Sequence, residues 1–321
     1  MMNITTDLHY IHHSAFRIPH FLLVEMEAQE TLPGSSVAVD DLAREMQAAV
    51  KLARAAGAAA LEHYGGPLQI VHKSENDDPV TQADMAANEV IIAGLQREFP
   101  EDGLLSEESL DTVRRLGRRR VWMIDPLDGT KGFIEGNGDF AVQIGLAVES
   151  VPALGVLYLP VTDVLYCAAQ GAGAWVVRPE REAEQLRVSA GRDLTRARLA
   201  ASRSHRSPRM DAVIRACGIK EEVRRGSVGI KIGLIVEQQC DLYISLASRT
   251  QQWDTCAPEA ILREAGGSLT DLWGQPYRYN TEDVQNRNGI AAAGTALHPS
   301  IVKRLGPLLA EFGRTRVGQT D

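Results

Sequence analysis

The side chains best suited to chemistry are two aspartates in the segment VWMIDPLDGTKGF, residues 121–133. Asp125 and Asp128 follow an apolar run and lie on either side of Pro126. Carboxylate oxygens are the ligands that Mg²⁺ prefers in proteins. Because proline interrupts a strand ladder, we expect both carboxylates at the mouth of a strand, where α/β folds bind their ligands. The segment therefore indicates a magnesium site.

Gly129 and the two residues after it are suited to binding an anion beside these carboxylates. Glycine lets the backbone approach a ligand closely, and the N–H groups of Gly129, Thr130 and Lys131 would cradle a phosphate if a helix begins there. Two other interpretations stay open. The segment is also typical of a capped Asp-Gly turn. It is close to the aspartyl-phosphate hydrolase motif DxDx(T/V), from which it differs by one residue of spacing.

Three further acidic positions lie elsewhere in the chain. Glu107 and Glu108 follow a short apolar stretch in LLSEES, Asp84 stands three residues after Thr81 at a predicted helix start, and Asp254 is the predicted N-cap of an apolar helix. Each position also has an ordinary explanation, as a solvated charge pair or a helix cap. Their combination and their order favour one shared site.

In that order the four motifs resemble those of the inositol monophosphatase superfamily: D-x-x-T-x-x-D, an EE pair, D-P-x-D-G-T, and W-D before a helix. The resemblance extends from about residue 41 to residue 309. The segments DPLDGTKGF and WDTCAPEAILREAGG are most similar to those of the 3'(2'),5'-bisphosphate nucleotidases, which remove the 3'-phosphate of adenosine 3',5'-bisphosphate. The resemblance implies a five-layer α-β-α-β-α sandwich and sensitivity to lithium.

The resemblance also implies a ligand set for two to three Mg²⁺ ions. Glu107, Asp125 and the backbone carbonyl of Leu127 would hold the first ion. Asp125, Asp128 and Asp254 would hold the second, so that Asp125 bridges the two. A third, looser ion would lie near Glu107. Such ions would polarise the phosphoryl oxygens and lower the pKa of a bound water.

Roles for the remaining residues of the motifs follow from the same resemblance. Asp84 and Thr130 would orient and deprotonate the water that attacks phosphorus in line, without a covalent enzyme intermediate. The backbone amides of Gly129 and Thr130 would bind the phosphate oxygens.

Substrate choice is assigned to two weaker motifs in the second half of the chain. ASRSH, which ends at Ser204 and His205, resembles a substrate-contacting segment of the bisphosphate nucleotidases. GSVGIK, which contains Ser227 and Lys231, resembles their segment beside the nucleoside and its other phosphate. A retained phosphate needs such donors. The alternatives are an ordinary polar loop and an exposed helical lysine.

Three functions remain open. The first is hydrolysis of adenosine 3',5'-bisphosphate, and the second is hydrolysis of an inositol phosphate or another sugar phosphate. The third is a non-catalytic sensor of a phosphometabolite. Val228 and Gly132 differ from the residues of several nucleotidases, which leaves the nucleotide preference open.

The elements that must position these residues follow from the periodicity of apolar side chains. We interpret residues 1–39 as a disordered extension, residues 40–185 as an α+β half with most metal ligands, and residues 186–321 as an α/β half with Asp254 and the substrate segments. Predicted helices are 40–64, 81–99, 210–218, 228–239, 255–267 and 301–313, and predicted strands are 120–124, 140–149, 153–160, 163–170, 173–178, 199–202 and 241–247.

Composition restricts the function classes further. The chain of 321 residues has a formal net charge of −8, which argues against a nucleic-acid polymer as partner. A phosphate substrate would then need bound cations near it. No apolar run is long enough to span a membrane, and the four cysteines form no CxxC motif, which is typical of reduced thiols. We expect a cytoplasmic monomer or homodimer that acts on a small-molecule phosphate.

Overall fold

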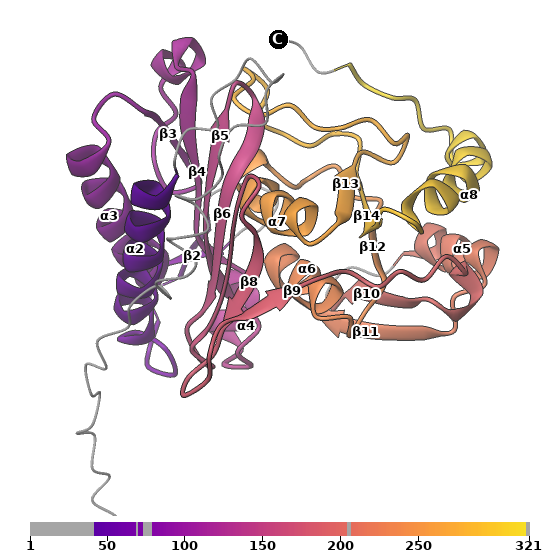
Figure 1. The fold of residues 1–321 in the computed structure, drawn as a ribbon, viewed down its shortest axis with the longest axis horizontal. Coiled ribbons are helices and arrows are strands. Elements are labelled where there is room, and N and C mark those ends of the chain that lie inside the picture. Colours follow the sequence, from indigo (N-terminus) through magenta and orange to yellow (C-terminus); the bar gives the residue numbers. More distant parts are fainter. Residues whose placement is uncertain (1–41, 69, 73–78, 204–206, 319–321) are drawn as a thin grey trace, which may run out of the picture.

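The computed structural model describes residues 42–68, 70–72, 79–203 and 207–318. In this part of the chain, α-helices accompany two large sheets and a two-stranded ribbon (Figure 1). The helices are α2 (Ala43–Leu61), α3 (Gln82–Glu98), α4 (Thr130–Ile134), α5 (Pro208–Cys217), α6 (Val228–Val236), α7 (Gln252–Glu264) and α8 (His298–Glu311). The strands are β1 (Ile70–His72), β2 (Pro79–Thr81), β3 (Gly103–Ser106), β4 (Arg120–Asp128), β5 (Ala141–Val148), β6 (Val151–Leu159), β7 (Val164–Ala169), β8 (Gly173–Val177), β9 (Glu184–Leu186), β10 (Arg198–Ser202), β11 (Glu221–Arg225), β12 (Leu242–Ser245), β13 (Gly267–Thr270) and β14 (Ile290–Gly294), with short 3₁₀ helices η1 (Val113–Gly117) and η2 (Leu194–Arg196).

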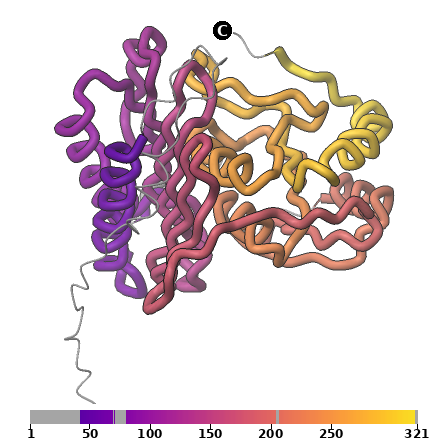
Figure 2. The backbone as a smooth tube through the Cα atoms, in the orientation of Figure 1, coloured from indigo at the N-terminus to yellow at the C-terminus, as the bar shows by residue number. Residues whose placement is uncertain are grey.

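The helices and sheets stack into five layers (Figure 1, Figure 2). Helices α2 and α3 cover one face of a seven-stranded sheet of order β3-β4-β5-β6-β7-β8-β9. Helices α6 and α7 fill the space between this sheet and a five-stranded sheet of order β11-β10-β12-β14-β13. Helices α5 and α8 cover the far face of the second sheet. The α-β-α-β-α sandwich is therefore confirmed.

Strand β4 shows why the first sheet is apolar on both faces. Trp122 and Ile124 point into the core beneath α2 and α3. Val121 and Met123, the alternate residues, point into the second core around α6 and α7. Because both faces are covered by helices, the strand is a continuous apolar run rather than an alternating one. This run ends at Asp125, and the carboxylates begin there.

Two predictions at the ends of elements are wrong. Pro126 does not end the strand, because β4 continues to Asp128 with a register shift against β5 between Asp125 and Asp128. A bulge leaves one position outside the ladder, so the missing N–H of proline costs no hydrogen bond. Asp254 is the third residue of α7 and not its N-cap, which is Gln251.

The other predicted elements are present with small differences in their bounds. Strands β11, β13 and β14 were not expected from the sequence, and β13 begins at Gly267, where the sequence predicts the last residue of a helix. The predicted start of the first helix, for which Asp40 or Asp41 would be the N-cap, and the extension 1–39 lie outside the described residues. The last strand of the first sheet ends at Leu186, although the boundary between two halves stays a prediction.

All four cysteines are free and buried: Cys167, Cys217, Cys240 and Cys256. Burial raises the pKa of the Cys167 thiol to about 12, which makes it unreactive.

Among the described residues, no helix combines the length and apolarity that crossing a membrane requires.

Helix α7 lies unusually close to the first sheet at Gly155. A Cβ atom built on Gly155 of β6 would lie 2.3 Å from the backbone oxygen of Ala257 in α7. Since that contact involves backbone on both sides, neither partner can move a side chain out of the way. The position of α7, and of Asp254 in its first turn, therefore depends on the absence of a side chain at Gly155.

The Gly155→Ala variant should consequently lose both stability and turnover. Overpacking of this kind costs about 1–3 kcal/mol, and the displaced α7 would carry Asp254 with it. Thermal denaturation and a phosphatase assay measure the two effects. Gly306→Ala in α8 is the matched control, because a Cβ there meets no atom within 4 Å. Equal stability of the two variants would contradict the role of this contact.

Candidate active site

The bulge at the end of β4 places Asp125 in the interior. Its carboxylate is 1% exposed, and its Oδ1 accepts a hydrogen bond of 3.0 Å from the Leu127 amide. The bulge turns the chain so that Asp128, three residues later, pairs with Ala141 across the sheet. Both predicted ligands thus lie at the same end of one strand.

Asp128 is held by residues from both halves of the chain. Its Oδ2 accepts hydrogen bonds from Gln143 Nε2 at 2.6 Å, from the Gly229 amide at 3.0 Å and from the Ser227 hydroxyl. Burial raises the pKa of this carboxyl above its usual value, although the donors Ser227 and Gly229 and the charge of Lys231 act to lower it. All three donors use the same oxygen, so Oδ2 fixes the side chain in place.

Asp84 and Thr130 lie together, as the proposed water-orienting pair requires. Asp84 occupies the third position of α3 and forms a capping box with Thr81, whose amide and hydroxyl donate to Asp84 Oδ2 at 2.8 and 2.7 Å. The Thr130 hydroxyl donates to the other oxygen, Oδ1, at 3.2 Å. Burial raises the pKa of Asp84. A local capping motif therefore aims one carboxylate oxygen at Thr130.

Asp254 reaches the same region from the first turn of α7. Its Oδ2 accepts a hydrogen bond of 2.7 Å from the Gln251 amide. Burial first, and then the charges of Asp128 and Glu107, raise the pKa of Asp254 well above the usual range.

Glu107 follows β3, which runs parallel to β4. Its amide donates to the Ile124 carbonyl at 3.1 Å, which places it beside the start of the acidic segment. Asn88 of α3 secures the chain on both sides: it accepts from the Ser106 hydroxyl at 2.6 Å and donates to the Ser109 hydroxyl at 3.1 Å. Glu107 is therefore held through its neighbours.

The combined effect of these placements is an anionic cluster around buried Asp125, in which Glu107, Asp128 and Asp254 are partly buried. Burial first, and then the charges of Glu107, Asp128 and Asp254, raise the pKa of Asp125 well above its usual range. Buried like charges at short range need cations nearby. Hard, anionic oxygen donors suit Mg²⁺, so the chemistry of this donor set fits the predicted ions.

The side chains do not, however, converge on one point. Within the described ranges, no three His, Cys, Asp or Glu side chains are placed so that they would hold a metal ion between them. Asp128 and Asp254 instead direct one oxygen each to donors of the protein. Ligation would require their other oxygens to turn toward a common ion, so the ligand set stays a prediction.

The predicted substrate residues have different placements. Ser227 caps α6 and donates to Asp128, so its hydroxyl already has a partner. Lys231 is buried, and Nζ donates to the Gly226 carbonyl at 3.0 Å and lies 4.7 Å from the ring centroid of Tyr243. It is therefore not an exposed helical lysine. Ser204 and His205 lie outside the described residues.

Gly129 requires the conformational freedom of glycine. Its φ of 101° is left-handed, and a Cβ there would lie 2.4 Å from the backbone oxygen of Asp139. Helix α4 begins at the next residue, Thr130, as the phosphate-cradling hypothesis expects. The binding of phosphate by these amides stays a prediction.

Sequence reasoning missed Asp139, which joins the two halves beside the site. Its carboxylate accepts from the Gly226 amide at 3.1 Å and pairs with Arg203 at 2.7 Å and Arg225 at 3.7 Å. In the sequence, Asp139 follows Gly138 and is typical of a turn. Its partners lie more than sixty residues away, so no local pattern indicates this role.

Comparison with known proteins identifies the family. The profile of the Inositol monophosphatase family matches residues 41–308. The 3'(2'),5'-bisphosphate nucleotidase CysQ of Escherichia coli (strain K12) is 37% identical over 236 residues, which are 73% of this chain and 93% of CysQ. Inositol monophosphatase 1 of Rattus norvegicus is 30% identical over 270 residues, 81% of this chain and 93% of the rat protein. The crystal structure of CysQ from Bacteroides thetaiotaomicron aligns with a TM-score of 0.67 at 34% identity, covering 78% of this chain and 97% of that one.

This chain belongs to the inositol monophosphatase family. The enzymes of the family are metal-dependent phosphatases, and this chain is a phosphoric monoester hydrolase. The resemblance inferred from the four acidic motifs is confirmed.

Replacing Asp125 by Asn should separate function from stability. The change removes one of the mutually repelling charges and keeps an oxygen that accepts from the Leu127 amide, so the metal-free protein should gain about 1–2 kcal/mol in free energy of unfolding. Turnover should be abolished. Denaturation in the presence of a chelator measures the first effect, and a phosphatase assay measures the second.

The matched control for this variant is Glu108→Gln, which changes a neighbouring carboxylate that is not assigned to a metal. It should keep turnover and change stability by no more than about 0.5 kcal/mol. A metal-free Asp125→Asn protein that is less stable than the parent, or one that retains activity, would contradict the assignment.

Proposed function

We propose that the protein is a 3'(2'),5'-bisphosphate nucleotidase that hydrolyses adenosine 3',5'-bisphosphate to AMP and phosphate with two to three Mg²⁺ ions. One observation carries the proposal: the β4 bulge brings Asp128 and buried Asp125 to the same strand end, and the Thr130 hydroxyl that follows them donates to Asp84 at 3.2 Å. Carboxylates gathered in this way favour bound cations. The names of its CysQ relatives support the nucleotide substrate.

Glu107, Asp125 and the Leu127 carbonyl would hold one ion, Asp125 with Asp128 and Asp254 a second, and a third would lie near Glu107. When bound, Mg²⁺ would polarise the phosphoryl oxygens and offset the charge on the leaving oxygen. The carboxylates are suited to this task because backbone donors anchor one oxygen of each before any ligand arrives.

The water-activating step belongs to Asp84 and Thr130. Because Thr81 occupies Oδ2 of Asp84, the free oxygen Oδ1 faces the Thr130 hydroxyl. The Thr130 hydroxyl donates a hydrogen bond to Asp84 Oδ1 and would accept one from a water, which it orients for attack on phosphorus. As the water attacks, its proton would pass to Thr130 while the Thr130 proton passes to Asp84. The raised pKa of Asp84 makes it a better proton acceptor than an exposed aspartate. The Gly129 and Thr130 amides would bind the phosphate oxygens.

A second candidate function is hydrolysis of inositol phosphates or another sugar phosphate. The rat inositol monophosphatase, which aligns with 81% of this chain, favours it. The third hypothesis, a non-catalytic sensor, is disfavoured because such a protein has no need of the Asp84–Thr130 contact. We further propose that the enzyme acts in the cytoplasm on a small-molecule phosphate, as a monomer or homodimer.

A panel of substrates tests the proposal. The purified enzyme with Mg²⁺ should hydrolyse adenosine 3',5'-bisphosphate with a higher kcat/KM than inositol 1-phosphate or fructose 1,6-bisphosphate. Addition of a chelator should abolish all three activities. Inositol 1-phosphate as the best substrate would favour the second candidate, and no turnover of any phosphate ester would favour the sensor.

The Lys231→Met variant tests how the retained phosphate is bound. If Lys231 and His205 hold that phosphate, the variant should lose roughly ten- to hundred-fold in kcat/KM for adenosine 3',5'-bisphosphate and little for inositol 1-phosphate. Lys231 also acts on Asp128 through its charge. An equal loss with both substrates would therefore assign Lys231 to the support of Asp128. Methionine keeps most of the buried apolar stem, so the fold should persist.

A further inference from the structure

The segment between β3 and η1 carries Glu107 but has little hydrophobic packing of its own. Leu110 is 96% exposed and Val113 is 78% exposed. From residue 107 to residue 115, only Arg115 is buried. An apolar core therefore does not hold this segment in place, and polar contacts must do so.

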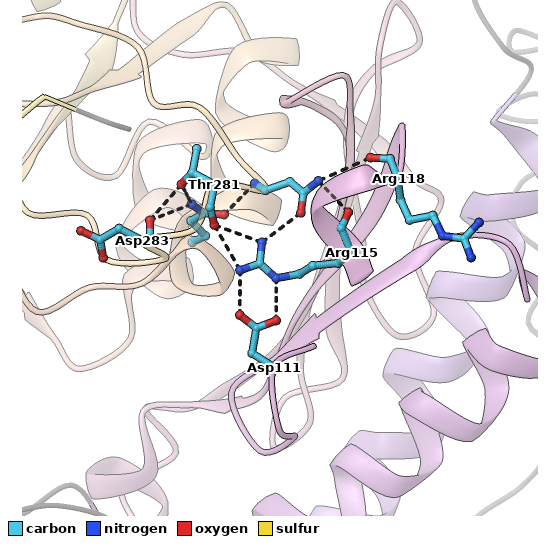
Figure 3. Close-up of polar contacts among 7 residues, drawn as sticks. Asp111, Arg115, Arg118, Thr281 and Asp283 are labelled. Carbon is cyan, nitrogen blue, oxygen red and sulfur yellow. Dashed lines mark hydrogen bonds and ion pairs between the residues drawn. The ribbon is translucent and has the colours of Figure 1, made fainter. Parts of the chain in front are cut away.

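The Ile124 carbonyl and Asn88 hold the beginning of the segment, and Arg115 holds its end (Figure 3). Its Nε and Nη2 donate to the two carboxylate oxygens of Asp111, each at 2.7 Å. Nη1 donates to Asn280 Oδ1 at 2.9 Å, and both terminal nitrogens donate to the Thr281 carbonyl at 3.1 Å. A guanidinium has five N–H donors, and all five have an acceptor here. The side chain is thus fully satisfied although it is 1% exposed.

The contacts continue from Arg115 to the start of α7. The Asn280 amide donates to Gln252 Oε1 at 2.7 Å, and Gln252 Nε2 donates to the Thr281 hydroxyl at 2.6 Å. Gln252 is buried and is the first residue of α7. The preceding amide, that of Gln251, binds Asp254. An unbroken hydrogen-bond network therefore connects the segment that carries Glu107 with the turn that carries Asp254.

Asn280 adds a geometric requirement to this network. Its φ of 62° is left-handed, a conformation that asparagine tolerates better than most residues. Its side-chain amide also donates back to the Arg115 carbonyl at 3.0 Å. The contact between Arg115 and Asn280 thus runs in both directions, which fixes the distance between the two segments.

We propose that Arg115 is a positioning residue for the metal site: it holds the Glu107 segment against the start of α7 and so sets the separation of Glu107 from Asp254. This inference rests on the proposed roles of those two carboxylates as ligands. Their mutual repulsion pushes the exposed segment outward, and the Arg115 network opposes it. Lysine cannot replace arginine here, because it has three donors at one point and no planar fork.

The test compares Arg115→Lys and Arg115→Met with the parent enzyme in Mg²⁺ titrations. The first readout is the rise in melting temperature with Mg²⁺ in the absence of substrate. The second is the Mg²⁺ concentration for half-maximal turnover. Because residues that orient ligands typically change metal affinity by ten- to hundred-fold, both half-points should move to roughly ten- to hundred-fold higher Mg²⁺. Lysine should not restore them.

Arg198→Met is the matched control. Arg198 begins β10 in the second sheet and pairs with Asp241 at 3.0 Å, and Asp241 is not an assigned ligand. Its loss should lower the melting temperature by the same amount at every Mg²⁺ concentration, and the half-points should not move.

The outcomes distinguish a positioning role of Arg115 from a purely structural role and from a wrong assignment of the metal site. If the Arg115 variants behave like the control, Arg115 is only structural and the inference is wrong. If the parent shows no stabilisation by Mg²⁺, the proposed metal site itself is wrong. Should both Arg115 variants fail to fold, Asp111→Asn replaces them, because Asp111 is partly exposed and its loss leaves the contacts to Asn280 and Thr281. Unchanged half-points in Asp111→Asn would then overturn the inference.

Discussion

The repulsion among the carboxylates gathered around buried Asp125 is the constraint on which the rest of the structure depends. Burial and the charges of Glu107, Asp128 and Asp254 all disfavour the ionised form of Asp125. Two like charges 4 Å apart cost about 4 kcal/mol at an effective dielectric constant of 20. Because these carboxylates repel one another, the fold has to hold each of them through contacts with other residues.

It does so by attaching each carboxylate to rigid backbone. Asp125 is held by the Leu127 amide within the β4 bulge, and Asp128 by the Gly229 amide of α6. Asp254 is held by the Gln251 amide at the start of α7. These anchors lie in two adjacent layers of the sandwich, the first sheet and the α6/α7 layer, and the close approach of α7 to Gly155 keeps these layers in register. The layered fold is thus the means by which distant residues become neighbours.

Local features of the site could be predicted from the sequence, whereas long-range ones could not. The capping box of Asp84 needs only residues three apart, so the motif indicates it directly. The continuation of β4 past Pro126 depends on a bulge against β5, which no property of the segment itself specifies. The burial of Lys231 follows from the position of α6 between two sheets, and periodicity alone does not distinguish it from an exposed helix. The partners of Asp139 and Arg115 are likewise set by tertiary structure.

In the proposed enzyme, the contact of Asp128 with α6 would link metal binding to substrate choice. Asp128 belongs to the first sheet, yet it accepts from Ser227 and Gly229 at the N-terminus of a helix in the second half. A helix N-terminus carries partial positive charge and stabilises an anion there. Since the same helix carries Lys231, any substitution that tilts α6 to accommodate a different substrate also moves an assigned metal ligand. A substitution would therefore change substrate specificity without disturbing Asp128 only if it does not displace the N-terminus of α6.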